Sequence, residues 1–194
     1  MSDVVKRYST TGTFISSFAE PSLNAPAGLA ISPTGDVLVP LNINGKFDRF
    51  NSNGTFLGIV AQGNGMNRPY DVTFGPSGDL FVADSAVNSI MRFDGTTGAF
   101  VGGFTPVNTS VNFISLAFGP NGDLFTGGSD NKIHRFSGTS GADLGVFAQG
   151  GGLNLPTDLA FAPNGDLFVV SSVSGQLLHF SGATGAFLEV RCLV

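Results

Sequence analysis

The sequence predicts an all-β fold built from repeated units of four antiparallel strands. Gly is abundant at 28 residues while charged residues make up only 12%, a balance that favours strands and tight turns over helices. No stretch shows the sustained periodicity of a helix. One pattern recurs at intervals of 43, 44 and 43 residues. A period of that length with four short strands per unit is typical of a β-propeller.

The repeats run through nearly the whole chain of 194 residues, which fits a single domain, 1–194, with a substantial core. Four segments align without gaps: "AGLAISPTGDVLVPL", "YDVTFGPSGDLFVAD", "ISLAFGPNGDLFTGG" and "TDLAFAPNGDLFVVS". Each carries a Pro at the same place, at Pro33, Pro76, Pro120 and Pro163. The complete repeats are expected at approximately 25–61, 68–105, 112–148 and 155–194.

The second repeat illustrates how each unit is expected to fold. "DVTFG" predicts a short first strand, and "PSGD" predicts a turn, because Pro fixes φ and Gly tolerates a positive φ. "LFVA" is a continuous apolar run, as expected for a strand covered on both faces by neighbouring units. "IMRFDG" predicts a third strand, and the turn "GTTG" leads into a fourth, "AFVGGF".

The chain begins with half of a repeat. "VVKRYSTTGTFISSF" matches only the third and fourth strands of a unit, so residues 1–18 are expected to form the outer-strand hairpin of a partial blade. Its Arg7 is in register with a basic or imidazole position in every later unit. The matching residues are Arg49, Arg92, Arg135 and His179.

The two inner strands that this hairpin needs are not found at the other end, since the last unit ends after its own outer strand, "FLEVRCLV". Three explanations are open. The hairpin forms an abbreviated fifth blade, a second copy covers the apolar end faces, or the sequence is a fragment of a longer propeller.

The composition narrows the classes of partner. Nine Lys and Arg against fourteen Asp and Glu give a formal charge of -5, so nucleic-acid phosphates would be repelled. The N-terminus does not read as a secretion signal and no long apolar segment occurs, so no membrane contact is predicted and the compartment is not indicated. The single Cys192 forms no internal disulfide, and no zinc-like cluster of Cys and His is present. We expect a protein partner or self-association, including a homo-oligomer.

The stretch "PYDVTFGPSGDLFVADSAVNSIMRFDGTTGAFVGGF" resembles the NHL-repeat class of β-propeller. Units of that class run from a Pro and a small hydrophobic strand through Gly-Asp into a "VAD" segment and an Arg-containing strand. The chain is also similar to the wider six-bladed-propeller-like superfamily, which includes gluconolactonase-type hydrolases and streptogramin lyases. Such propellers commonly carry five to seven blades, so four and a half units depart from the pattern. The resemblance implies a fold more strongly than an activity.

The residue just before each first strand is expected at the rim of the central channel: Gly28, Asp71, Ser115 and Asp158. Two carboxylates two blades apart can converge on a divalent cation, because hard cations prefer oxygen ligands. In gluconolactonase-type enzymes, which the chain resembles, metal ligands come from this kind of position, and the match extends to Asp71 and Asp158 only. The alternative is that each Asp caps its local turn through backbone N–H groups.

Other candidate residues lie at the ends of strands and in the loops between units. Asp84 is acidic where the other units have Leu41, Gly128 and Ser171, and it marks either a site or ordinary drift in a solvated loop. The loops "AQGNGMNRPY" and "AQGGGLNLPT" are near twins whose polar groups could face a peptide or a glycan. The binding candidates are Asp84, Asn64, Asn67, Arg68 and Asn154.

The recurrent turn acids and the basic third-strand residues are expected to be structural, forming turn hydrogen bonds and inter-strand ion pairs. His134 and His179 do not occupy equivalent positions, and neither sits near a recognisable nucleophile. No catalytic residue and no cofactor beyond that divalent cation are predicted. The sequence therefore favours a non-enzymatic NHL-like propeller scaffold for protein binding or self-assembly. The alternative is a metal-dependent hydrolase or lyase of the gluconolactonase-like superfamily.

Overall fold

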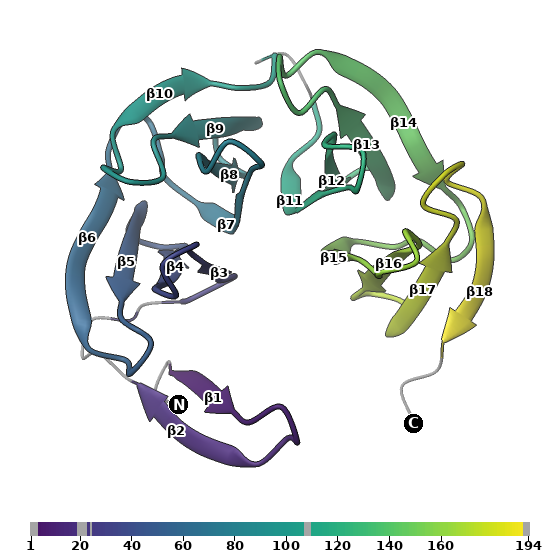
Figure 1. Cartoon of the computed structure of the whole chain (residues 1–194). Helices are drawn as coiled ribbons and strands as arrows, with labels where there is room; N and C mark the ends of the chain where they lie inside the picture. Colours follow the sequence, from purple (N-terminus) through teal and green to yellow (C-terminus); the bar gives the residue numbers. More distant parts are fainter. Residues whose placement is uncertain (1–3, 19–22, 24, 107–109, 192–194) are drawn as a thin grey trace.

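The computed structural model describes residues 4–18, 23, 25–106 and 110–191, so Cys192 lies outside the described residues. Within the described part of the chain, eighteen strands form five antiparallel sheets that are arranged radially, like the blades of a propeller (Figure 1). One sheet has two strands and four sheets have four. The predicted fold class, four complete blades preceded by a half-blade, is confirmed.

The strands of each sheet follow one another along the chain. The half-blade is the hairpin of β1 (Val5–Tyr8) and β2 (Phe14–Phe18). The first complete blade contains β3 (Ala30–Ile31), β4 (Val37–Leu41), β5 (Lys46–Phe50) and β6 (Phe56–Gln62), and the second contains β7 (Pro69–Phe74), β8 (Leu80–Asp84), β9 (Ser89–Phe93) and β10 (Phe100–Gly103). The third contains β11 (Phe113–Phe118), β12 (Leu124–Gly128), β13 (Lys132–Phe136) and β14 (Asp143–Gln149). The fourth contains β15 (Pro156–Phe161), β16 (Leu167–Ser171), β17 (Gln176–Phe180) and β18 (Phe187–Arg191).

The turn between the first two strands of each blade carries the Pro-X-Gly-Asp pattern. In the second blade Gly78 has a φ of 85°, where only glycine is unstrained, and its N–H donates to the carbonyl of Gly75 at 2.9 Å. Asp79 at the end of the turn accepts from Arg92 Nε at 2.8 Å. Equivalent pairs join Arg49 to Asp36 and Arg135 to Asp123. The predicted ion pairs of the repeat are therefore confirmed.

The core lies between the blades, because the second strand of each blade is covered on both faces. In β8, Leu80 and Val82 pack toward the first blade, whereas Phe81 and Ala83 pack toward the third. The alternation follows from the two-residue period of a strand. Ring contacts cross each boundary between complete blades: Phe81, for example, meets Phe118 of the third blade with centroids 5.1 Å apart. Such aromatic pairs contribute about 0.5–1.5 kcal/mol beyond the area that they bury.

The propeller has two ends that differ from its interior (Figure 1). The hairpin lies beside the first blade and adds Val5 to the cluster formed by Val37, Val39, Leu41 and Phe50. The fourth blade lies at the other end, and within the part of the chain that the structure describes its sheet contains only its own four strands.

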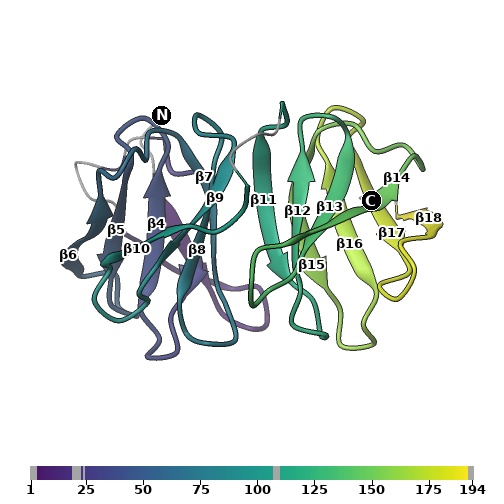
Figure 2. The same ribbon diagram turned by 90° about the horizontal axis from the view of Figure 1, so that it is seen from above.

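The side view in Figure 2 shows the strands running between two opposite faces, where the loops gather. The loops that link one blade to the next share a face with the loops between second and third strands, since neighbouring strands are antiparallel. Among the described residues there is no helix with the length and apolar character to cross a membrane.

Candidate functional site

The starts of the first strands meet in a central cavity of about 790 Å³. The cavity is bounded by the first residues of β7, β11 and β15, by the segment before β3, and by the beginning of the hairpin. Its polar and charged lining consists of Lys6, Tyr70, Asp71, Thr157 and Asp158. The structure therefore places both carboxylates of the predicted metal pair on one cavity.

Asp71 uses both of its carboxylate oxygens within the scaffold. Oδ1 accepts the backbone N–H of Val72 at 2.8 Å, and Oδ2 accepts that of Leu116, in the next blade, at 2.7 Å. A Cβ on Gly28 would lie 2.6 Å from Oδ1, so glycine at that position leaves room for the carboxylate. Asp71 thus joins the second blade to the third. It also caps the backbone of its own strand, as the alternative to a metal site predicts.

Burial raises the pKa of Asp71 to about 7. The two backbone N–H donors oppose this effect, and the negative charge of Asp158 adds slightly to it. A carboxyl group with a pKa near neutrality exchanges a proton readily at physiological pH, which is a property of many functional carboxylates.

The residues equivalent to Asp71 differ in what they contact. Ser115 Oγ donates to the carbonyl of Pro156 at 3.2 Å and so links the third blade to the fourth. Asp158 Oδ1 accepts the N–H of its own neighbour, Leu159, at 2.9 Å. No blade follows Asp158 in the described chain, and the residue is exposed. Within the described residues no cluster of three or more His, Cys, Asp or Glu side chains has the arrangement of a metal site.

Asp84 is fully buried and holds the loop that precedes its blade. Its carboxylate accepts the backbone N–H groups of Asn67 at 2.7 Å, Arg68 at 3.1 Å and Ala86 at 2.9 Å. The structure therefore brings together three of the predicted binding residues, with Asn67 and Arg68 contributing main-chain donors. The break in repeat symmetry at Asp84 has a structural use, because an acid at this place satisfies several N–H groups at once.

Ser171 performs the same task in the fourth blade. Its Oγ accepts the N–H of Asn154 at 2.8 Å and donates to a carbonyl of the same loop. Asn64, in the near-twin loop, has a φ of 55°, a backbone conformation that Asn tolerates better than most residues. The two loops are thus tied to their blades through equivalent strand-end residues.

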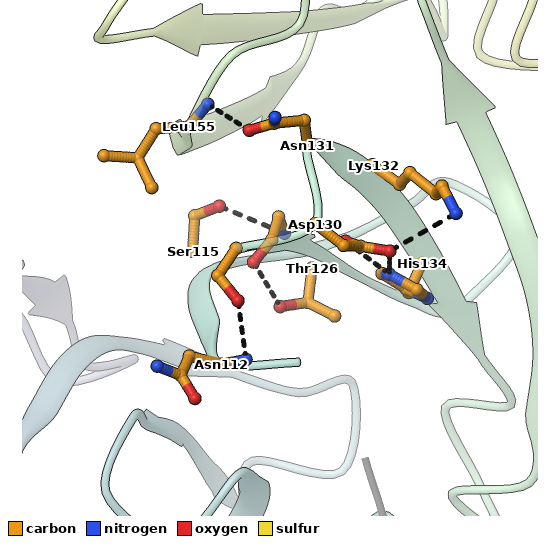
Figure 3. Close-up of polar contacts among 10 residues, drawn as sticks. Asn112, Ser115, Thr126, Asp130, Asn131, Lys132, His134 and Leu155 are labelled. Carbon is orange, nitrogen blue, oxygen red and sulfur yellow. Dashed lines mark hydrogen bonds and ion pairs between the residues drawn. The ribbon is translucent and has the colours of Figure 1, made fainter. Parts of the chain in front are cut away.

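A polar cluster at the end of β12 and the start of β13 belongs to the loop face (Figure 3). Asp130 lies 3.1 Å from His134 Nε2 and 3.6 Å from Lys132 Nζ. Asn131 Oδ1 accepts the N–H of Leu155 at 2.9 Å, which is a further link from the third blade to the fourth. The side chains of this cluster are engaged with one another and with neighbouring loops.

His179 replaces the repeat arginine in the fourth blade. Its Nε2 lies 3.1 Å from Asp166 and its Nδ1 lies 3.2 Å from Glu189. The imidazole stacks on Phe168 with ring centroids 4.5 Å apart. Neither His179 nor His134 lines the central cavity.

The end faces expose residues whose equivalents are buried elsewhere, and the sequence interpretation did not single them out. Leu29, before β3, is 49% exposed, whereas the equivalent Val72 is 3% exposed. At the other end Val170 is 37% exposed, whereas the equivalent Ala83 is fully buried. Ile31 is also exposed. The alignment of the repeats could have predicted this exposure, because a position that faces a neighbouring blade in every interior repeat is uncovered in a repeat at an end.

Comparison with solved structures places this architecture among known propellers. The chain is similar to virginiamycin B lyase from Staphylococcus aureus, with a TM-score of 0.75 and 19% identity over 100% of this chain and 64% of that chain. The chain has the propeller fold of the streptogramin lyases. A catalytically inactive histidine-to-alanine variant of the same lyase with quinupristin matches at a TM-score of 0.74 and 19% identity, over 98% and 64%. A streptogramin B lyase structure matches at 0.75 and 16% identity, over 100% and 63%.

The propeller likeness confirms the resemblance to the superfamily that contains streptogramin lyases, at the level of fold. The chain spans less than two thirds of the length of these lyases. No family model matches the sequence, and no curated protein matches it. Assignment to the NHL class in particular stays a prediction.

Proposed function

We propose that the chain is a non-enzymatic, NHL-like propeller scaffold that binds protein, another copy of itself included, through its two incompletely covered end blades. The observation that carries this proposal is the exposure of repeat positions that are buried wherever two blades meet. Leu29 is such a position at one end, beside the exposed Ile31, and Val170 is such a position at the other end, beside the half-buried Phe168. Apolar surface of this kind is characteristic of interaction sites.

The polar residues of the channel rim support the same proposal. The oxygens of Asp71, the hydroxyl of Ser115 and the carboxylate of Asp84 are all engaged with backbone groups of the scaffold. Because these polar groups hold blades and loops together, their main role is structural, as expected for a scaffold.

Light scattering over about a hundredfold range of concentration tests the proposal, since association through an exposed face follows mass action. We expect the mass to rise with concentration and Val170→Asp to abolish the rise. Ile43→Asp is the matched control, because Ile43 is 62% exposed in the loop between β4 and β5 and lies outside the end faces. A monomer at every concentration, unchanged by Val170→Asp, and no binding of any added repeat polypeptide would overturn it.

A second candidate is a metal-dependent hydrolase or lyase acting at the central cavity. It is favoured by Asp71, whose pKa is raised to about 7 and which lines the same cavity as Asp158. Asp71 and Asp158 would hold the ion, and Asp71 would need to release a backbone donor to do so. Calorimetric titration with calcium, manganese or zinc at millimolar concentration tests this candidate. Binding that Asp158→Asn and Asp71→Asn both weaken would support it, and no binding would refute it.

A further inference from the structure

We propose that the two end faces form one docking site for a polypeptide of about two and a half further repeats of the same kind, which completes the ring. This inference rests on the proposed function and names the partner that the end faces take. This polypeptide, called the occupant below, would pack its first strand against β15–β18. Its last two strands would extend the sheet of the hairpin, with the last strand paired to β1.

The hairpin has the free edge that this pairing requires. In every complete blade the third strand lies between a second and a fourth strand, but among the described residues β1 pairs with β2 alone. A strand with an unpaired edge accepts a further strand through its main-chain groups. Beside β1 lies a cavity of about 280 Å³, bounded also by Leu29, Ile31 and Val37 of the first blade. This is the place that the first and second strands of a complete blade would fill.

Arg7 indicates what the incoming strands carry. In three complete blades the equivalent arginine is paired with the Asp of the Pro-X-Gly-Asp turn, and in the fourth His179 contacts Asp166. Arg7 is exposed, and its Nη1 donates to the carbonyl of Ser52 at 2.8 Å. An occupant with the same turn brings a carboxylate to this guanidinium, and the two charges are complementary.

The fourth blade carries the matching half of the site. Asp71 accepts an N–H from its own strand and another from the next blade, whereas the contact of Asp158 is with its own strand. Phe81 meets a Phe of the next blade, and Phe125 does the same, with centroids 5.1 and 4.9 Å apart. Phe168 occupies the equivalent position without a following blade. The occupant therefore begins with a first strand that offers a backbone N–H and an aromatic ring.

The length of the occupant follows from two independent counts. The hairpin lacks half a blade, so the occupant must carry a whole number of repeats and one inner pair. Four and a half repeats cover 64% of the lyase chain, which scales to about seven repeats for a chain of that length and leaves about two and a half. A second copy in the same ring would bring the total to about nine, which exceeds that size.

The first test adds a synthetic peptide of residues 69–84, the inner pair of the second repeat, to the intact chain. We expect saturable binding by fluorescence anisotropy and protection of β1 amides from hydrogen exchange. Arg7→Ala in the chain, or Asp79→Ala in the peptide, should each weaken binding by about three- to tenfold, and the two together by no more than either alone. Lys6→Ala in the chain is the control for loss of a positive charge, and it should leave binding within about twofold.

The second test joins residues 66–171 to the end of the chain, which adds two complete blades and an inner pair. We expect a concentration-independent monomer that melts at a higher temperature than the original chain. Arg7→Ala should lower its stability by more than it lowers that of the original chain, where Arg7 donates to the carbonyl of Ser52. Absence of peptide binding, or an extended chain that melts no higher or aggregates, would overturn the inference. Continued self-association of the original chain in that case would leave the proposed function intact.

Discussion

The boundary between the second and third blades and the uncovered face of the fourth blade are built from the same repeat positions. In the first region Phe81, Ala83 and the Oδ2 atom of Asp71 all contact the third blade. In the second region Val170 is exposed and Asp158 contacts its own strand. The comparison shows that each repeat carries side chains suited to pack against a following blade. Whether a following blade is present decides which of these side chains are buried and which carboxylates are desolvated.

The largest expected effect comes from removing an aromatic ring at a closed boundary. Phe125→Ala deletes a ring that is nearly fully buried against Phe147 and Phe161, and it should lower the free energy of unfolding by about 3–5 kcal/mol. Phe168→Ala, at the equivalent open position, should cost about 1 kcal/mol, since less surface returns to water. Equilibrium denaturation in urea measures both. Equal losses for the two variants would show that the fourth blade's outer face is covered.

The next effect comes from adding a methyl group at the same boundary. A Cβ on Gly127 would lie 2.4 Å from the carbonyl oxygen of Pro156 in the fourth blade, so Gly127→Ala should force the blades apart and cost about 1–3 kcal/mol. The equivalent residue of the fourth blade, Val170, already bears a larger side chain in the open. Val170→Ala should therefore change the free energy of unfolding by less than about 0.5 kcal/mol. A neutral Gly127→Ala would contradict the close approach of the two blades.

A third effect is a pH dependence that distinguishes the two carboxylates of the cavity. The pKa of Asp71 is raised from 3.8 to about 7, so the unfolded state releases this proton at lower pH than the folded state. Its contribution to stability is complete below the unfolded pKa and is lost as the pH rises through about 7. Melting temperatures between pH 4 and 8 should show this decline, and Asp71→Asn should remove it.

Asp158→Asn provides the matched comparison for that measurement. It removes a weak contribution to the raised pKa of Asp71, so the decline should persist and shift only slightly toward lower pH. A decline that disappears in Asp158→Asn and remains in Asp71→Asn would reverse the assignment.

Much of the fold was predictable because it is written in local patterns that repeat. The Pro-X-Gly-Asp turns, the apolar second strands and the register of Arg49, Arg92 and Arg135 specify four-stranded units without reference to tertiary contacts. The half-repeat around Arg7 was likewise visible, because it aligns with the second half of each unit.

The candidate site was less predictable, because its partners are backbone groups that have no signature in the sequence. Asp71 was identified as a rim carboxylate, but the N–H of Leu116 that it accepts belongs to a residue 45 positions away. Asp84 was identified by its broken symmetry, but its use became clear only when the loop at Asn67 and Arg68 lay against it.

The sequence by itself determined the four complete repeats and the half-repeat of this chain, the strands within them and the alternation of side chains along each strand, since period and alternation are local properties of the chain. Only the tertiary structure decided that Leu29 and Val170 are exposed while Val72 and Ala83 are buried. The physical reason is that burial and desolvation depend on which surfaces meet, and identical repeats meet different neighbours at the ends of the array than within it.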